Sequence, residues 1–509
     1  MKQTTFLACL AVLPGILILR IAAEAKQPKQ ITLTPIGRYS AGGRNSAAIA
    51  AYDPATRRIF SINPDQEQVD VLDISDPTLP QLVFTIPLGG PPTSVAVRDD
   101  VVAVSVENAV TTDPGSVQFF DTNGNVLNAV TVGPLPDMLT FTPNGRRLLV
   151  ANEGEPSDDY TIDPEGSVSI VDMTRGAANL TQADVWTATF NDAIPKTNAA
   201  SIRIYGPNAT LAQDLEPEFI TVSHNSKTAW VTLQENNAIA TLDIKAGVFT
   251  ELVGLGFKNH NEAGNGLDAS DRDGGINIAN WPVFGMYQPD AIDSYRVRGS
   301  TYVVTANEGD TRDFAGFSEE ARVGSINLDP TAFPTAAILQ QDANLGRLTV
   351  TRANGDADGD GDFDEIFVPG GRSFSIRTAA GHLVFDSGDD FEQITAAQVP
   401  LSFNSNGTSS SFDTRSDNKG PEPEGLVLGK AFGRTYAFIG LERTAGVMVY
   451  NVSDPFNPMF VQYVNTSPDD ISPEGFVFIK EDDSPNGKPI LVVSHEISGT
   501  TTIFEIAKD

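Results

Sequence analysis

The stretch EPEFITVSHNSKTAWVTLQENNAIATLDI, residues 216–244, contains the pattern that decides the fold. It begins with Glu-Pro-Glu, continues as an alternating apolar strand, turns at a polar tip, and returns as a second strand ending in Glu235. A third strand follows and ends in Asp243. Short alternating strands separated by polar turns are typical of an antiparallel meander.

The same pattern recurs six more times along the chain. Four clear copies begin at residues 135, 288, 422 and 472, and two weaker copies begin at residues 45 and 92. Seven copies of one meander, each about 40 residues long before insertions, predict an all-β, seven-bladed β-propeller. A pair of β-sandwiches is the alternative fold.

Long segments separate the copies, and we interpret them as insertions on one face of the propeller. In a meander, the start of the first strand, the end of the second strand and the connection to the next unit share one rim. The insertions fall at these places, within a single propeller domain spanning residues 26–509: 174–215, 245–288, 309–371 and 389–421. Because loops on a rigid scaffold often carry function, we expect function on this face and a bare opposite face.

The first 25 residues have the pattern of a cleaved signal peptide. Lys2 precedes the apolar run FLACLAVLPGILIL, and Ala23-Glu24-Ala25 offers a cleavage site. The only cysteine, Cys9, is removed with it, so the mature chain would have neither disulfides nor thiolate ligands. No later segment is long and apolar enough to span a membrane, and no C-terminal anchor motif is present. The expected location is secreted, periplasmic or extracellular.

The chain is strongly acidic, with 66 Asp and Glu against 34 Lys and Arg, a formal net charge of -32 and a sequence pI of about 4.3. Such a surface repels phosphate backbones, so nucleic acid is not an expected partner. It suits a secreted protein that holds divalent cations, although solubility alone also explains an acidic surface.

Acidic residues occupy two equivalent positions in most of the seven copies. The start of the first strand carries Asp137, Glu218, Asp290, Glu424 and Glu474, with Ala48 and Thr93 in the other two copies. The end of the second strand carries Glu107, Glu153, Glu235, Glu308, Glu442 and Glu496, with Asn63 in the first copy.

Both positions belong to the rim that carries the insertions, so these carboxylates converge on one channel mouth. Carboxylates crowded together repel one another unless a cation lies among them, and Ca²⁺ prefers oxygen ligands. We predict a metal site there, held by Asp137, Glu153, Glu218, Asp290, Glu308, Glu424 and Glu474. In the alternative interpretation, these residues pair with arginine or accept hydrogen bonds from turn amides.

A second predicted calcium site is local to the segment DADGDGDFDE, residues 356–365. Its spacing matches the first half of an EF-hand loop, but the twelfth position is Phe367, so it is not a standard EF-hand. The expected ligands are Asp356, Asp358, Asp360, Asp362 and Asp364. The alternatives are another divalent or trivalent metal, or a solvated acidic turn. LDASDRDGG, residues 267–275, is a weaker candidate.

The common enzyme motifs are absent from the sequence, and its four histidines share no ligand spacing. Catalysis would therefore depend on metals and carboxylates. Four arginines in the insertions are candidates for a phosphate-binding cluster: Arg203, Arg272, Arg312 and Arg372.

Four segments together resemble one known family: ANEGEPSDDYTIDPEGSVSIVDM (151–173), GNGLDASDRDGGINIANWPVFGMYQPDAI (264–292), GDADGDGDFDEIFVPGGRSFSI (355–376) and NKGPEPEGL (418–426). The chain resembles the choice-of-anchor I family. That family is similar to a mesenchyme-specific cell surface glycoprotein associated with biomineral deposition, and some bacterial members are labelled alkaline phosphatases.

The resemblance implies an exported protein and leaves two functions open. In the first, a calcium-loaded propeller binds mineral, matrix or glycan at the cell exterior. In the second, carboxylate-held metals at the channel mouth hydrolyse a phosphate monoester, so whether the protein is an enzyme stays open.

Overall fold

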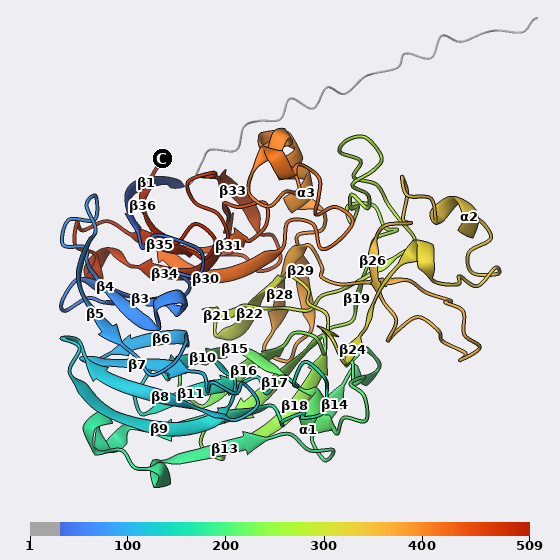
Figure 1. Cartoon of the computed structure of the whole chain (residues 1–509). Helices are drawn as coiled ribbons and strands as arrows, with labels where there is room; N and C mark the ends of the chain where they lie inside the picture. The colour runs from blue at the N-terminus through green and yellow to red at the C-terminus, as the bar shows by residue number, and fades with distance from the viewer. Residues whose placement is uncertain (1–30) are drawn as a thin grey trace, which may run out of the picture.

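The computed structural model describes residues 31–509, so the predicted signal peptide (1–25) and Cys9 lie outside the described residues. The predicted all-β class is confirmed, because nearly all regular structure in this range is strand. Seven antiparallel sheets form the main body, six with four strands and one with a fifth (Figure 1).

The first three sheets are simple meanders that follow one another along the chain. The first contains β2 (Ala50–Asp53), β3 (Arg58–Asn63), β4 (Gln68–Asp73) and β5 (Gln81–Pro87). The second contains β6 (Pro92–Arg98), β7 (Val101–Val106), β8 (Pro114–Asp121) and β9 (Val126–Pro134). The third contains β10 (Pro136–Phe141), β11 (Arg147–Asn152), β12 (Ser167–Asp172) and β13 (Val185–Thr189).

The next three sheets keep this order but are interrupted by longer segments. The fourth contains β15 (Pro217–Val222), β16 (Thr228–Leu233), β17 (Ala238–Asp243) and β18 (Val248–Gly254), with the short β14 (Lys196–Thr197) parallel to β18. The fifth contains β21 (Ile292–Val297), β22 (Ser300–Asn307), β28 (Ser373–Thr378) and β29 (Leu383–Asp386). The sixth contains β30 (Pro423–Ala431), β31 (Arg434–Leu441), β32 (Val447–Asn451) and β33 (Met459–Val464).

The seventh sheet joins both ends of the described chain. It contains β34 (Pro473–Ile479), β35 (Ile490–His495) and β36 (Thr500–Lys508), and its outer strand is β1 (Ile31–Ser40). β1 pairs antiparallel with β36, with Ile31 opposite Lys508. The first strand of each sheet contacts the first strands of the two neighbouring sheets, and β2 meets β34, so the sheets form a closed ring around a central channel. The fold is therefore a β-propeller.

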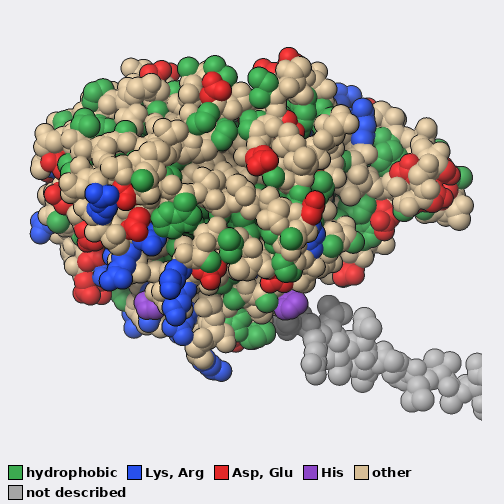
Figure 2. Space-filling view, turned by 90° about the horizontal axis from the view of Figure 1, so that it is seen from below, with side chains coloured by type: hydrophobic (Ala, Val, Ile, Leu, Met, Phe, Trp, Pro, Cys, Tyr) green, Lys and Arg blue, Asp and Glu red, His purple; other side chains and the backbone are tan. Residues whose placement is uncertain are grey.

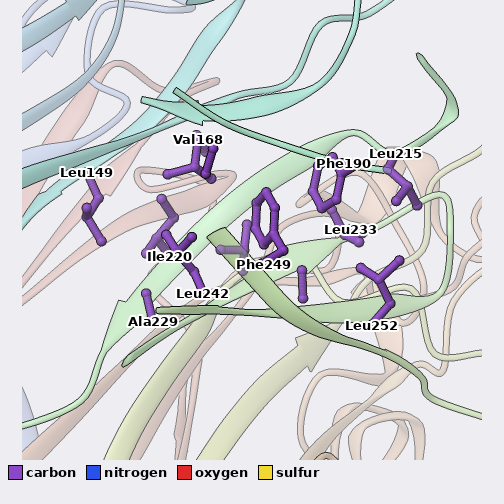
Figure 3. Close-up of a cluster of buried hydrophobic side chains, with 14 of the residues drawn as sticks. Leu149, Val168, Phe190, Leu215, Ile220, Ala229, Leu233, Leu242, Phe249 and Leu252 are labelled. Atoms are coloured by element: carbon purple, nitrogen blue, oxygen red, sulfur yellow. The ribbon is translucent and has the colours of Figure 1, made fainter. Parts of the chain in front are cut away.

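The hydrophobic core is divided among the interfaces between neighbouring sheets, each of which has its own buried cluster. Figure 3 shows the cluster between the third and fourth sheets, where Leu149 and Val168 face Leu233 and Leu242. In the same cluster, the Phe190 and Phe249 rings stack with their centroids 4.1 Å apart. Alternating strand residues supply these side chains, which is why the period-two pattern predicted the fold.

Two of the predicted insertions contain a propeller strand. The segment 174–215 includes β13, the outer strand of the third sheet, and 245–288 includes β18, the outer strand of the fourth. Outer strands are half-exposed and less apolar than inner ones, so their sequences resemble loops. The extra chain is therefore shorter than predicted in both places.

The rest of the inserted chain contains short elements, most of them beside the propeller on the right of Figure 1, with α3 (Asp390–Gln398) at the top and α1 (Leu211–Asp214) near the lower edge. They are α1 (Leu211–Asp214), β19 (Phe257–Asn259), β20 (Phe284–Met286), β23 (Asp313–Phe314), β24 (Phe317–Ser318), β25 (Glu320–Arg322), α2 (Ala336–Leu339), β26 (Thr349–Thr351), β27 (Phe367–Val368) and α3 (Asp390–Gln398). Segments 267–283 and 321–368 share a buried cluster of their own. Across residues 31–509, no helix combines the length and apolar character needed to cross a membrane.

Candidate metal centre at the channel mouth

A β-bulge recurs where the first strand of a blade begins. In five sheets the pairing register shifts directly after a proline that opens the strand: Pro92, Pro136, Pro217, Pro423 and Pro473. Proline has no N–H group to donate to a neighbouring strand, so it is tolerated at the first residue of a strand and at a bulge. The residue after it is the acid of the repeat, or Thr93 in the second sheet. Because a bulge re-aims side chains, this position is turned out of the regular strand alternation.

The backbone before these prolines is unusual as well. Leu135, Glu422 and Ser472 each precede such a proline and have positive φ angles of 43°, 53° and 64°, and Gln288, which precedes Pro289 before the fifth sheet, has a φ of 44°. Non-glycine residues rarely adopt this conformation, and where they do the surrounding structure must hold it. Strained backbone therefore recurs at the rim where the acids lie.

A backbone hydrogen bond places the second acid beside the first. The N–H of Glu153 donates to the carbonyl of Leu135 at 2.9 Å, and the N–H of Glu496 donates to that of Ser472 at 2.8 Å. Glu107 and Glu442 make the same bond to Pro91 and Glu422. The end of the second strand is thus tied to the start of the first, and the two predicted sets of acids share one rim.

A cavity of about 730 Å³ occupies the central channel, and most of the acids at these two positions line it at one end. We call this end the acidic mouth, and seven of its lining residues are those predicted from the sequence: Asp137, Glu153, Glu218, Asp290, Glu308, Glu424 and Glu474. Deeper in the channel the lining becomes largely apolar, with Met138, Phe219, Val427 and Phe476.

One side of the acidic mouth is neutralised by basic side chains. Lys419 Nζ lies 3.1 Å from Glu308 Oε1 and 3.2 Å from Glu422 Oε2. Arg443 Nη1 lies 2.9 Å from Glu442 Oε1, and Arg415 also pairs with Glu422. Although burial alone would raise the pKa of Glu422, these three cations hold it below its usual value. The triplet Glu308, Glu422 and Glu442 is therefore an internal ion-pair network.

The opposite side, from the third and fourth sheets, has no such neutralisation. Glu153, Glu218 and Glu235 each offer a carboxylate oxygen within 4.8 Å of the others. Within residues 31–509, none of the three forms an ion pair with Lys or Arg. Glu235 is only 5% exposed, and its Oε2 atom is buried without a hydrogen-bond partner among the described residues.

The electrostatics of this triplet follow from burial and crowding. Burial, and then the neighbouring Glu235 and Asp137, raise the pKa of Glu218 well above its ordinary value. Burial together with Glu218 and Glu155 does the same to the pKa of Glu153. Burial also raises the pKa of Glu155 to about 7. Three carboxylates held so close are unfavourable as anions, and a divalent cation between them would remove that cost.

A second triplet, Asp290, Glu308 and Glu424, lies at the same mouth within the same 4.8 Å limit. Glu308 is shared with the ion-pair network, so Lys419 neutralises part of this triplet. Glu424 Oε2 is buried without a hydrogen-bond partner among the described residues. Asp137 and Glu474 line the cavity but belong to neither triplet.

The segment 356–365, which we call the acidic loop, lies in the insertion 309–371, and none of its residues lines the acidic mouth. Asp356, Asp358 and Asp360 form one exposed group of carboxylates, and Asp362 and Asp364 form another with Asp329. Asp356 accepts hydrogen bonds from the N–H groups of Gly359 and Gly361, at 2.7 and 3.1 Å. The five predicted ligands are thus split between two groups.

The four insertion arginines do not form a free phosphate-binding cluster. Arg203 pairs with Glu319, Arg312 with Asp214 and Glu216, and Arg372 with Glu392, all of them buried. Arg272 is exposed and pairs with Asp342. In LDASDRDGG, Asp271 is bound by Arg347, and Asp268 accepts hydrogen bonds from the N–H groups of Ser270 and Asn277. Arg203 and Arg312 do come together over the Tyr205 ring, but all four arginines are paired with carboxylates, so the structure does not show the predicted phosphate-binding cluster.

Sequence reasoning missed the basic residues of the acidic mouth. Lys419 lies in the segment NKGPEPEGL, three residues before Glu422, and Arg443 directly follows Glu442. Their closeness in sequence to the two rim acids was a usable signal. Glu155, two residues after Glu153, is a further acid beside the triplet.

Comparison with known proteins places this site in a family. The model of the choice-of-anchor I domain matches residues 48–455. The chain belongs to the choice-of-anchor I family. Among similar proteins, Gigasin-3a of Magallana gigas is 30% identical over 190 residues, which are 33% of this chain and 66% of that protein. Mesenchyme-specific cell surface glycoprotein of Strongylocentrotus purpuratus is 30% identical over 283 residues, 49% of this chain and 36% of that protein.

The matches thus span less than two thirds of either curated relative. Among solved structures, a chain of Kuenenia stuttgartiensis hydrazine synthase is similar with a TM-score of 0.49 and 13% identity, covering 92% of this choice-of-anchor I chain and 97% of the other. The β-propeller domain of Cps50 (Swd1) from Myceliophteria thermophila has a TM-score of 0.42 and 9% identity, covering 94% and 99%. The propeller assignment rests on the strand pairing described above.

Proposed function

We propose that this chain is an extracellular calcium-binding β-propeller whose acidic mouth holds a divalent cation between Glu153, Glu218 and Glu235. The observation that carries the proposal is the close approach of these three carboxylates without a basic partner among residues 31–509. The unpartnered Glu235 Oε2 atom supports it, since a buried anionic oxygen without a donor is costly. Carboxylate oxygens are the ligands that Ca²⁺ prefers, and it takes six to eight of them, waters included.

The extracellular part of the proposal has separate support. The predicted signal peptide directs the chain to export, and a relative at 30% identity is named a cell surface glycoprotein. The acidic loop provides further exposed carboxylates on the insertion. We propose that calcium stabilises this face as a surface that binds mineral, matrix or glycan.

Calcium binding is tested by thermal unfolding and calorimetric titration of the metal-free protein. At about 100 times the dissociation constant, calcium should stabilise the folded state by about 2.7 kcal/mol and raise Tm accordingly. Glu218→Gln should remove most of this rise, because it takes one of the three carboxylates away. The matched control is Glu474→Gln, which changes the equivalent position of the seventh sheet outside both triplets. Equal calcium responses in wild type and Glu218→Gln would overturn the proposal.

The metal-free proteins provide a second check on the same variants. Glu218→Gln removes one of three crowded buried carboxylates, so its metal-free Tm should be at or above that of the wild type. A lower metal-free Tm would mean that Glu218 has a structural role that the triplet does not explain.

A second candidate function is phosphomonoester hydrolysis at the same mouth. It is favoured by one observation: Lys419 and Arg443 line the same cavity as Glu153 and Glu218 of the triplet, so cations and a metal could face one anionic group. The test is turnover of a chromogenic phosphate monoester by the protein loaded in turn with calcium and other divalent metals. Activity that is lost in both Glu218→Gln and Arg443→Met would support it, whereas no turnover with any metal would exclude it.

A further inference from the structure

The face opposite the acidic mouth carries a concentration of basic residues that the sequence analysis did not anticipate. In each blade the first strand runs from the acidic mouth to this face, where a short turn leads to the second strand. In the third to sixth sheets, the segments 142–147, 223–227, 296–300 and 430–434 contain no Asp or Glu. For a chain with nearly twice as many acids as bases, this is a pronounced local reversal.

Six basic side chains of these segments are exposed and form no ion pair within residues 31–509. We call them the cationic arc: Arg146, Lys227, Arg296, Arg298, Lys430 and Arg434. Figure 2 shows a group of lysine and arginine side chains toward the left of the view, the end away from α2 and β26 in Figure 1. Because no carboxylate neutralises these side chains, their summed charge gives this face a positive potential that attracts anions.

A cavity of about 590 Å³ lies within this arc. Arg296, Lys430 and His224 line it, and no carboxylate does. Ser294, Tyr295 and Thr301 also line it. The hydroxyl of Tyr295 is buried without a hydrogen-bond partner among the described residues. That hydroxyl has no surface open to the cavity, so the cavity combines the positive charges of Arg296 and Lys430 with the side chains of Ser294 and Thr301.

We infer that this cavity binds an oxyanion: a carboxylate, sulfate or phosphate group carried by a small ligand or by the end of a chain. Hydrogen bonds from guanidinium and ammonium groups to such anions are short and strong. The net charge of -32 opposes long polyanions, which favours a single anionic group over an extended nucleic acid. The inference is independent of the calcium proposal, since the two sites share no residue.

The experiment is calorimetric titration at low ionic strength with three probes: sodium sulfate, sodium phosphate and a galacturonate trimer. A chelator is present throughout, so calcium at the acidic mouth cannot contribute. We expect saturable binding of at least one probe, weakened by added sodium chloride because the contacts are ionic. Stronger binding of the trimer than of the inorganic ions would identify a sugar acid as the source of the oxyanion.

Three variants of equal charge change separate a built site from general attraction. Lys430→Met and Arg296→Met remove side chains that line the cavity, and each should lower affinity about tenfold. Arg434→Met removes a charge of the same arc outside the cavity lining and should lower affinity by about twofold or less. No saturable binding of any probe, or an equal loss in all three variants, would overturn the inference. All three positions are exposed, so the variants should fold, and thermal unfolding of each variant checks this.

Discussion

Lys419, from the segment before the sixth sheet, places its ammonium group 3.1 Å from the Glu308 carboxylate at the end of the second strand of the fifth sheet. The same ammonium lies 3.2 Å from Glu422. One lysine therefore neutralises acids from two adjacent blades. This divides the acidic mouth into a side with internal cations and a side, around Glu218, without them.

Replacing Lys419 by Met should destabilise the protein by about 3–5 kcal/mol, because it leaves the buried Glu308 carboxylate without a cation, whereas Glu422 keeps Arg415 and Arg443. Urea unfolding with and without calcium measures the effect. Lys488→Met is the control: Lys488 is exposed and its bond to Glu505 at 2.6 Å lies on the surface, so the loss should be about 0–1 kcal/mol. Similar losses in the two variants would show that Lys419 does not have this neutralising role.

Glu319→Gln should loosen the insertion of the fifth blade. Glu319 pairs with Arg203, accepts a hydrogen bond from the Tyr205 hydroxyl at 2.6 Å, and is fully buried. Removing its charge leaves Arg203 unpaired in the interior, at a cost of about 3–5 kcal/mol. Limited proteolysis should then cut the insertion (309–371) faster than in wild type. Asp342→Asn, at an exposed pair with Arg272, should leave the cutting rate unchanged; a rate equal to wild type in Glu319→Gln would contradict the prediction.

His495 should make the protein less stable as the pH falls below about 6.5. The side chain is 1% exposed, and burial lowers its pKa to about 4, although Asp470 opposes the shift. His495 therefore binds a proton near pH 6.5 in the unfolded chain but only near pH 4 in the folded chain. Between pH 7 and pH 5 this group alone should remove about 2 kcal/mol of stability.

The measurement compares urea unfolding of wild type and His495→Gln across this range. The difference between their stabilities should shrink as the pH falls, since other titrating groups are common to both. His224→Gln, at an exposed histidine, should follow the wild-type curve. Parallel curves for wild type and His495→Gln would contradict the assignment.

Asp360→Asn should remove calcium bound at the acidic loop and leave the calcium-dependent Tm rise intact. Asp356, Asp358 and Asp360 are exposed, so a cation there crosslinks only local chain. Calorimetric titration should lose one binding event, while the stabilisation through Glu218 persists. Loss of the whole Tm rise in Asp360→Asn would show that the stabilising calcium site is the acidic loop and not the acidic mouth.

The sequence by itself determined the repeated meander and the rim on which Asp137, Glu218 and Glu474 lie. Both depend on local rules: side chains alternate along a strand, and in four of the sheets a proline followed by an acid opens the first strand at a bulge. The outer strands β13 and β18 escaped this reasoning because half-exposed strands lack a strong apolar pattern.

Only the tertiary structure decided how the charges are arranged. The pairing of β1 with β36 closes the ring from opposite ends of the described chain. That closure brings carboxylates of separate blades within 4.8 Å, and it decides that Glu308 pairs with Lys419 while Glu235 forms no ion pair with a basic residue of the described range. It also gathers unpaired bases from four blades around the other end of the channel. Distances between blades depend on how the sheets pack around the channel, and no local pattern in the sequence encodes them.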